Sequence, residues 1–342
     1  MTDHQPRRDA APETKSEPEP ERSAPGPRMG GRRALLLAGA GVATALGGAA
    51  AYAYLRGGAS KANPGAIRDH RVWVPATTPR IVIARGPSPA NNVRAALGRI
   101  GGMRQLVSRG DVVVLKPNIG WDRIPEQAAN TDPEVVAALV SACLDAGAAQ
   151  VIVTDAPVHD AARSFARSGI AKAAEQAGAT VILPGEAEKR SVEIPGKPGR
   201  WSALEPLVRA TKVINVPVAK HHGFTRFSAG MKNWFGAIAE GREMLHLGMD
   251  ESVTGLLALF RPTLTVVDAT RVLVRNGPTG GNLDDVKRID AVAVSLDPVA
   301  ADAWAASQVG VDPSGVDALA LAQRKGLGLV DFRSLSPVEI EV

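Results

Sequence analysis

The chain has very little cysteine and few aromatic residues. Cys143 is the only cysteine among its 342 residues, so an internal disulfide is excluded. One thiolate cannot supply the ligands of an iron–sulfur cluster, which excludes a cluster held within this chain. It also excludes a cysteine-rich zinc site. Aromatic residues make up 4% of the sequence, so a core must depend on alanine, valine, leucine and isoleucine.

An excess of charge of one sign is also missing. The formal net charge is only +5. Lysine and arginine are spread along the sequence, and no basic stripe with interleaved aromatic residues is visible. Because nucleic-acid binding depends on such a stripe, we expect no nucleic-acid partner.

The amino-terminal part has the pattern of an export signal. Residues 1–28 are rich in proline, glutamate and arginine and lack hydrophobic periodicity, which predicts disorder. In residues 29–56, Arg32 and Arg33 precede an uncharged run from Ala34 to Leu55. This is the twin-arginine pattern, so we expect the twin-arginine translocase as a partner and a location outside the cytoplasm. The run is also long enough to remain as a membrane anchor.

Glycine and proline are frequent in residues 57–79, which predicts a linker. From Arg80 onward, short apolar strands alternate with helical segments. This alternation predicts an α/β domain over residues 80–342, in which a three-layer, mostly parallel open sheet has helices on both faces. Residues 217–262 are expected to cover one edge of the sheet. The expected strands are Arg80–Ala84, Asp111–Leu115, Gln150–Thr154, Thr180–Leu183, Lys212–Val216, Thr263–Val267 and Ala291–Ser295.

Unusual polar residues follow directly after most of these strands. In a parallel sheet the carboxyl ends of the strands share one edge, and ligands bind in the crevice there. We therefore expect these residues to meet in one cleft, where mixed charges shift pKa values. In chain order they are Lys116 and Asn118, Asp155, Lys220 with His221 and His222, Asp268, and Asp297.

The segment from Gly223 to Gly236 is the richest in polar and glycine residues. Lys232 and Asn233 are expected at the amino end of a helix, where backbone N–H groups favour an anion. A carboxylate or a phosphate is therefore the expected ligand. His246 lies in the following loop and is expected to close over the cleft.

Taken together, these motifs resemble the family known as domain of unknown function 362. The resemblance extends over roughly residues 80–330, and its most distinctive segment runs from Lys232 to Gly236. Many members of that family carry ferredoxin-type cysteine motifs and are described as iron–sulfur proteins. This chain departs from them, so the resemblance implies that any redox role needs a separate partner protein. It identifies no cofactor and no reaction.

Three functions remain open on the sequence alone. An enzyme acting on a small anionic substrate would hold it with lysines and asparagines and move a proton with a histidine that a carboxylate orients. Proton abstraction next to a carboxylate fits this set, and a racemase resembling the nickel-cofactor lactate racemases is one version. A metal site of histidines and aspartates and a non-catalytic ligand-binding protein of the cell envelope are the alternatives. The candidate catalytic residues are His221, His222, His246, Asp155 and Asp268, and the candidate ligand-binding residues are Lys116, Asn118, Lys220, Lys232, Asn233 and Asp297.

Overall fold

The computed structural model describes residues 67–342, together with Met1. The predicted disordered segment, the predicted twin-arginine signal and residues 57–66 of the predicted linker lie outside the described residues. Within residues 67–342, every helix is too short or too polar to cross a bilayer.

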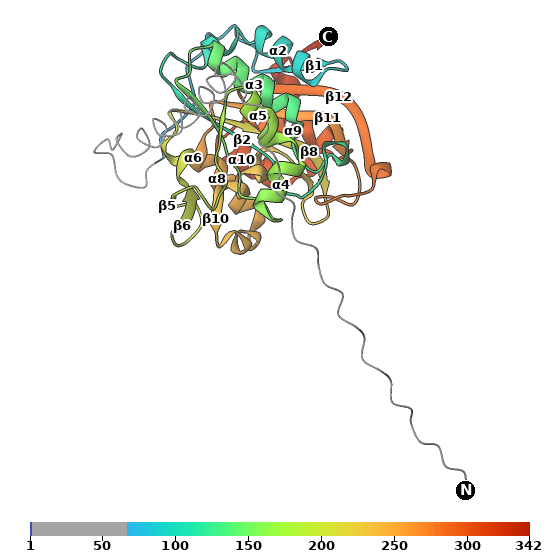
Figure 1. Ribbon diagram of the computed structural model, residues 1–342. Coiled ribbons are helices and arrows are strands. Elements are labelled where there is room, and N and C mark those ends of the chain that lie inside the picture. The colour runs from blue at the N-terminus through green and yellow to red at the C-terminus, as the bar shows by residue number, and fades with distance from the viewer. Residues whose placement is uncertain (2–66) are drawn as a thin grey trace, which may run out of the picture. The chain divides into compact units, whose positions relative to one another are not determined.

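The centre of the fold is one large mixed sheet (Figure 1). Strand β8 (Val218–His222) pairs with β11 beyond the end of β7, and β9 (Arg226–Ser228) pairs with β8. In sheet order, the other strands are β13 (Val338–Glu341), β1 (Ile81–Arg85), β12 (Val286–Ser295), β11 (Leu264–Leu273), β7 (Lys212–Val216), β2 (Val112–Pro117), β3 (Gln150–Val153) and β4 (Thr180–Val181).

Most neighbouring strands of this sheet are parallel, and β12 is the main exception. It runs antiparallel to both β11 and β1. It also follows β11 as the second strand of a hairpin, and each of the two strands is ten residues long. The mostly parallel sheet predicted from the sequence is thus confirmed. The carboxyl end of β12, however, lies at the edge where the parallel strands begin.

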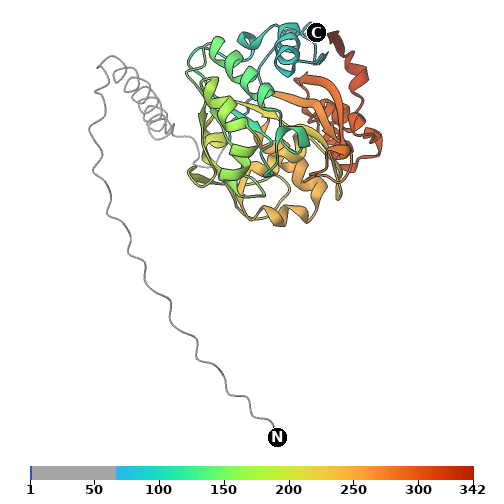
Figure 2. The same ribbon diagram turned by 45° about the vertical axis from the view of Figure 1, so that its right-hand side comes forward.

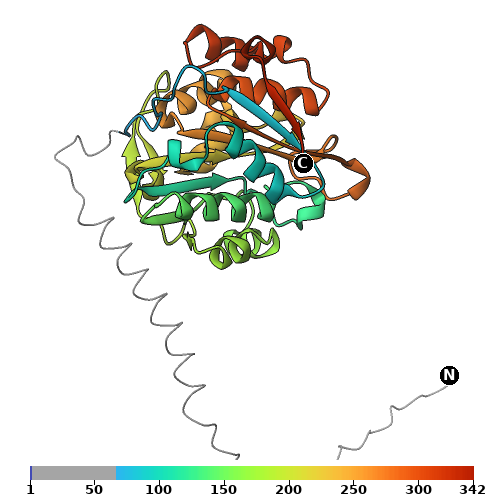
Figure 3. The same cartoon turned by 90° about the horizontal axis from the view of Figure 1, so that it is seen from above.

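Helices cover both faces of the sheet and complete three layers. On one face, α2 (Pro89–Arg99), α3 (Pro133–Asp145), α4 (Ala161–Arg167) and α5 (Ile170–Gln176) enclose one core. On the other face, α8 (Met249–Phe260), α9 (Pro298–Gln308) and α10 (Asp317–Arg324) enclose a second core. Figure 3 shows these two groups, green and orange-red, on opposite sides of the strands.

Successive side chains along each strand point to opposite faces of the sheet, so they belong alternately to the two cores. Val82 of β1 packs into the core of the first face, whereas Ile83 packs into the core of the second. The same alternation sends Val113 to the first core and Val114 to the second. Strands buried on both sides read as continuous runs of apolar residues, which is why β2 was recognisable in the sequence.

Helix starts follow local sequence signals. Asp132 accepts a hydrogen bond from the backbone N–H of Glu134 at 2.9 Å, and Pro133 occupies the first turn of α3. A capping carboxylate followed by proline is a standard helix start. Figure 2 shows α2 and α3, coloured teal to green, side by side along one face of the sheet. In the chain, α2 precedes β2 and α3 precedes β3.

Two helices predicted from the sequence differ in the structure. The sequence predicts one helix over residues 161–177, and the structure has two, α4 and α5, separated at Gly169. The backbone of Gly169 has φ 74°, a left-handed conformation that glycine adopts without strain. The sequence also predicts a helix over residues 232–239, and the structure has a series of shorter elements there. These are α7 (Gly230–Asn233), the 3₁₀ helix η3 (Trp234–Ala237) and the strand β10 (Ile238–Glu240).

A small second sheet and several short elements complete the fold. Strand β10 pairs with β6 (Trp201–Leu204), which pairs with β5 (Lys189–Val192). The remaining short elements, given with their bounds, are α6 (Glu205–Arg209), η1 (Met103–Gln105), η2 (Pro125–Gln127), η4 (Arg242–His246), η5 (Leu283–Asp285), η6 (Pro313–Gly315) and η7 (Phe332–Leu335).

Residues 67–74 are fixed to the main domain by His70. This side chain is 1% exposed. Its backbone N–H donates to the carbonyl of Arg261 at 3.2 Å, and its carbonyl accepts from the hydroxyl of Thr263 at 2.7 Å. Its ring nitrogen Nδ1 lies 3.3 Å from the carbonyl of Thr211. These partners precede β7 and β11, so the chain enters the domain at the edge where the parallel strands begin.

Candidate functional site

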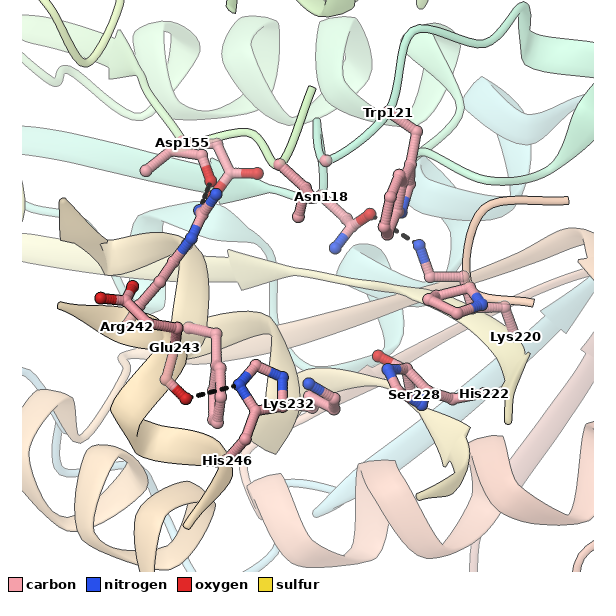
Figure 4. A pocket seen from close by; sticks show the side chains of 16 residues that line it. Asn118, Trp121, Asp155, Lys220, His222, Ser228, Lys232, Arg242, Glu243 and His246 are labelled. Atoms are coloured by element: carbon pink, nitrogen blue, oxygen red, sulfur yellow. Dashed lines mark hydrogen bonds between the residues drawn. The ribbon is translucent and has the colours of Figure 1, made fainter. Parts of the chain in front are cut away.

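A pocket lies at the opposite edge, where the parallel strands end. Its volume is about 360 Å³. Figure 4 shows polar side chains surrounding it, with Trp121 and Lys220 on one side and Arg242 on the other. The lining residues include Asn118, Trp121, Asp155, Lys220, His222, Ser228, Lys232, Gly236, Arg242, Glu243, His246 and Pro278.

A buried ion pair forms the floor of this site. Lys116 is the last residue but one of β2 and Asp155 follows β3, so the two parallel strands bring them together. Nζ of Lys116 lies 2.5 Å from Oδ1 of Asp155, and the lysine side chain is 0% exposed. Burial lowers the pKa of Lys116, which Asp155 opposes. Oδ2 of Asp155 accepts from the backbone N–H of Ile119 at 2.7 Å, so both carboxylate oxygens are engaged.

Asn233 and Asn118 link this pair to a second lysine. Oδ1 of Asn233 accepts from Lys116 at 3.2 Å and from Nδ2 of Asn118 at 3.0 Å. Oδ1 of Asn118 in turn accepts from Nζ of Lys220 at 2.9 Å. A continuous chain of hydrogen bonds therefore joins β2, α7 and β8. Such a network holds each member in one orientation.

The two lysines that face the pocket have depressed pKa values. Burial lowers the pKa of Lys220 to about 7, with Asp155 opposing and the charges of Lys232 and Lys116 adding to the decrease. Burial also lowers the pKa of Lys232 to about 8, and the neighbouring Arg242 contributes. At neutral pH a fraction of each side chain is therefore an uncharged amine. Groups with this property are typical of reaction sites.

The ammonium groups of these lysines have few partners. Lys220 donates to Asn118 and to the carbonyl of Ala129. Among the described residues, Nζ of Lys232 has no hydrogen-bond or ion-pair partner and lies 4.1 Å from the ring centroid of Phe235. An ammonium has three N–H donors. Both lysines therefore keep donor capacity for a ligand in the pocket.

The pocket approaches the buried ion pair because residue 236 is a glycine. A Cβ atom on Gly236 would lie 1.9 Å from Oδ1 of Asp155 and 2.9 Å from Nζ of Lys116. No other residue type fits there without moving the pair. The carbonyl of Gly236 also accepts from the backbone N–H of Ala156 at 2.8 Å, which fixes the loop after β3 against η3.

The two adjacent histidines have different surroundings. His222 lines the pocket, and its Nδ1 accepts from the backbone N–H of Phe224 at 3.2 Å and of Thr225 at 3.3 Å. Burial and the neighbouring lysines lower the pKa of His222 to about 3. His221 instead accepts from the N–H of Gly277 at 3.2 Å and is not among the lining residues. His246 lies in η4 and lines the pocket, with its ring 5.2 Å from that of Phe235.

Asp268, a candidate catalytic residue, is not among the residues that line the pocket. Its Oδ2 accepts from the backbone N–H of Asp132 at 2.7 Å, and its Oδ1 accepts from the N–H and hydroxyl of Thr270 at 2.9 and 2.8 Å. Burial raises its pKa to about 6, and the charge of Asp132 contributes. The side chain therefore fixes the start of α3 against β11.

Asp297 is not brought to this pocket, which corrects the expected convergence. It follows β12, the antiparallel strand, and so lies at the opposite edge of the sheet. There its Oδ1 accepts from the backbone N–H groups of Val299 and Ala300 at 3.0 and 2.9 Å, capping α9. The expectation that Asp297 follows a parallel strand is wrong, because β12 is antiparallel to both of its neighbours.

The start of α7 already holds a carboxylate from the chain itself. Asp302 of α9 accepts from the N–H of Gly230 at 2.6 Å and of Met231 at 2.9 Å. The sequence placed an external anion at this position. The buried side chain occupies it instead, and Lys232 and Asn233, at the other end of this short helix, face the pocket network.

Among residues 67–342, no three His, Cys, Asp or Glu side chains are grouped so that they could hold a metal ion. The histidines and aspartates proposed as metal ligands from the sequence are thus not assembled into such a group. Lys116, Asn118, Asp155, Lys220, Asn233 and Lys232 do come together, and His222 and His246 line the same pocket.

The chain is similar to known proteins. A family model described as "Domain of unknown function (DUF362)" matches residues 113–307. The chain belongs to the DUF362 family. Every lining residue of the pocket falls within the matched range. The matched range ends before α10 and β13, and it begins after β1 and α2.

Individual relatives are more distant. The chain is 28% identical over 257 residues to the thylakoid-associated protein sll1697 of Synechocystis sp., an alignment that covers 69% of this chain and 74% of the relative. Among solved structures, the lactate racemase apoprotein from Thermoanaerobacterium thermosaccharolyticum aligns with a TM-score of 0.38 and 11% identity. That alignment covers 66% of this chain and 57% of the racemase, so the DUF362 chain spans little more than half of that protein.

Arg242 and Trp121 are among the lining residues of this DUF362 pocket that the sequence prediction missed. Arg242 donates to the carbonyls of Ala156 and Pro157, which lie in the loop after β3. Trp121 packs edge-on against His159 with ring centroids 5.0 Å apart. Arg242 lies only four residues before His246, which was singled out. The glycine before it, with φ 72°, marks the turn that directs η4 to the pocket.

Proposed function

We propose that this pocket binds a small molecule carrying a carboxylate or a phosphate, and that the protein is an enzyme moving a proton on that molecule. The observation that carries this proposal is the group of cations around one pocket. Lys220, Lys232 and Arg242 all line it, and of its two acidic side chains Asp155 is paired with Lys116. A volume of about 360 Å³ lies within the range of small-molecule sites.

The anionic group fits between Lys232 and Arg242. Both side chains approach the pocket from the segment after β9; burial lowers the pKa of Lys232, and the charge of Arg242 lowers it further. An anion bound between the two side chains would offset both the repulsion between their charges and the loss of water around Lys232. Its negative charge raises the pKa of Lys232, so binding and protonation of this lysine favour each other.

Lys220 is the candidate base. Two of its donor positions are directed to Asn118 and Ala129, so the lone pair of the neutral amine is free for a proton from the ligand. In the proposed step, the C–H bond next to the carboxylate breaks and Lys220 takes the proton. The electron pair spreads from carbon onto the carboxylate oxygens, where Lys232 and Arg242 stabilise it. Return of the proton from Lys220 completes the cycle without another reactant.

We further propose that the chain is exported by the twin-arginine route and remains associated with a membrane. The paired arginines and the uncharged run to Leu55 support this proposal. The name of the Synechocystis relative, a thylakoid-associated protein, also supports an association with a membrane.

Hydrogen exchange in D₂O tests the enzymatic step. The full chain is incubated with lactate or malate, and loss of the signal of the hydrogen next to the carboxylate is followed by NMR. We expect exchange with at least one probe, and a decrease of about 10²–10⁴-fold in Lys220→Met, which is the usual contribution of a general base. Lys172→Met, an exposed lysine of α5, is the matched control and retains exchange.

Calorimetry with inorganic phosphate and lactate separates an enzyme from a binding protein. Binding that is weakened in Lys232→Met but unaccompanied by exchange for any probe contradicts the enzymatic proposal and favours a non-catalytic binder. Equal affinities in the wild type and in Lys232→Met contradict the anion site itself.

A further inference from the structure

A second group of cations lies at the edge of the sheet opposite the candidate site. Arg71, Arg80 and Arg261 line a hollow of about 200 Å³ together with Leu296, Leu327 and the glycines Gly326 and Gly328. Arg80 directly precedes β1, and Arg261 lies between α8 and β11. These positions are at the amino ends of strands. The hollow is therefore formed at the edge where the parallel strands begin.

The balance of charge around this hollow is positive. Asp69 lies 2.6 Å from Arg71 and 3.4 Å from Arg261, and the hydrogen bond from Arg71 lowers its pKa to about 2, so it remains an anion. Asp297 also lines the hollow, but its oxygens accept three backbone N–H groups. Arg68 is exposed in the same segment. The hollow and the segment from Arg68 to Arg71 therefore hold four arginines and two aspartates.

An exposed tryptophan lies beside these arginines in the sequence. Trp73 follows Arg71 by two residues and is 85% exposed, the largest exposure of any tryptophan on the described surface. Tryptophan is enriched where a protein meets the interface between lipid and water, because its ring is apolar and its N–H is polar. Arginine in the same place attracts anionic headgroups.

The chain itself leads to this edge. The uncharged run predicted as a signal or anchor ends at Leu55, twelve residues before Ile67. Twelve residues span at most about 40 Å when fully extended. His70 fixes the segment that follows to the starts of β7 and β11. A domain held by this run therefore has its amino edge within reach of the bilayer.

We propose that Arg68, Arg71, Trp73, Arg80 and Arg261 form a membrane-binding surface that takes the phosphate of anionic lipid headgroups. This amino-edge surface rests on the proposed association with a membrane. When it contacts the bilayer, the candidate pocket at the carboxyl edge faces the aqueous side, because the two lie at opposite ends of the same strands.

Quenching of tryptophan fluorescence by brominated lipids tests this surface. The full chain is reconstituted with vesicles of phosphatidylcholine containing one-fifth brominated phosphatidylglycerol, or with brominated phosphatidylcholine alone. We expect quenching with the anionic vesicles that Trp73→Phe removes. The triple variant Arg71→Gln/Arg80→Gln/Arg261→Gln is expected to lose at least two-thirds of this quenching. Arg94→Gln/Arg99→Gln, exposed arginines of α2, retains it.

Co-sedimentation with the same vesicles distinguishes failure of the proposed surface from failure of the proposed membrane association. Protein that sediments with the vesicles but shows equal quenching in the wild type and in Trp73→Phe keeps the membrane association and overturns the surface. Protein that stays in solution overturns the association and the surface together. Binding of inorganic phosphate that the triple variant abolishes, without any quenching by lipid, assigns the hollow to a free anion and also overturns the proposal.

Discussion

The two edges of the sheet hold their charges in different ways. At the carboxyl edge, Lys116 and Lys220 are buried, and their pKa values are depressed by the loss of water. At the amino edge, Arg71 keeps 60% of its side chain exposed beside Asp69. Buried charges require fixed partners, whereas exposed ones are stabilised by solvent. The first edge therefore suits a specific reaction, and the second suits contact with a surface that carries many similar charges.

The largest difference between the edges is expected in stability. Lys116→Met leaves Asp155 buried without its cation, which costs about 3–5 kcal/mol of unfolding free energy for a broken buried pair. Arg71→Gln breaks an exposed pair and is expected to cost about 1 kcal/mol or less. Urea denaturation at pH 7 measures both. Similar losses in the two variants would show that the edges do not differ in this way.

A second difference concerns the pH dependence of stability. Burial raises the pKa of Asp302 to about 7 from 3.8. The carboxyl group of Asp302 thus binds its proton more tightly in the folded protein than in the unfolded chain. The stability that this protonated group contributes below pH 4 is lost as the pH rises to about 7. A pKa difference of one unit corresponds to about 1.4 kcal/mol of unfolding free energy. If only part of the difference is realised, Asp302→Asn should reduce the fall in unfolding free energy over this pH range by about 2 kcal/mol.

Thermal unfolding of the wild type and of Asp302→Asn between pH 4 and pH 7.5 measures the slope of stability against pH. Asp145→Asn, an exposed carboxylate at the end of α3, is the control and should leave the slope unchanged. A slope that is equal in the wild type and in Asp302→Asn would assign the pH dependence to other carboxylates, Asp268 first among them, because its pKa is raised to about 6.

The smallest effect is expected in the affinity of the pocket for phosphate. Because the pKa of Lys232 is about 8, its charge is present at pH 6.5 and largely absent at pH 9.5. Loss of one charge contact weakens binding by about tenfold, or about 1.4 kcal/mol. Lys232→Arg keeps its charge at both pH values, so calorimetry should find a smaller decrease. A decrease of the same size in both proteins would exclude titration of Lys232 as the cause.

The sequence predicted the framework of the fold well because its strands are buried on both faces. The run ending at Leu115 is apolar, mostly β-branched and followed by Lys116, and the run ending at Val216 is interrupted only by Asn215. This pattern identified Lys116, Asp155 and Lys220, which the parallel strands do bring together. Each residue could be placed because the end of a parallel strand defines a position in space.

The remaining differences come from features that single segments do not encode. The reversed direction of β12 depends on the hairpin with β11, and its apolar run reads the same in either direction. The strands β8 and β9 are short and polar, so their pairing was not visible. Arg242 reaches the pocket through contacts with a loop 85 residues earlier in the chain, and such contacts leave no local pattern.

The long hairpin has a consequence for how the pocket can vary among related proteins. Strands β11 and β12 have ten residues each, whereas β7 beside them has five, and the turn beyond them carries Pro278 into the pocket lining. Each residue added to both strands lengthens this wall by about 3.3 Å. An odd number of added residues turns the side chains beyond them to the opposite face. Relatives that accept larger ligands should therefore carry matched, two-residue insertions in this hairpin.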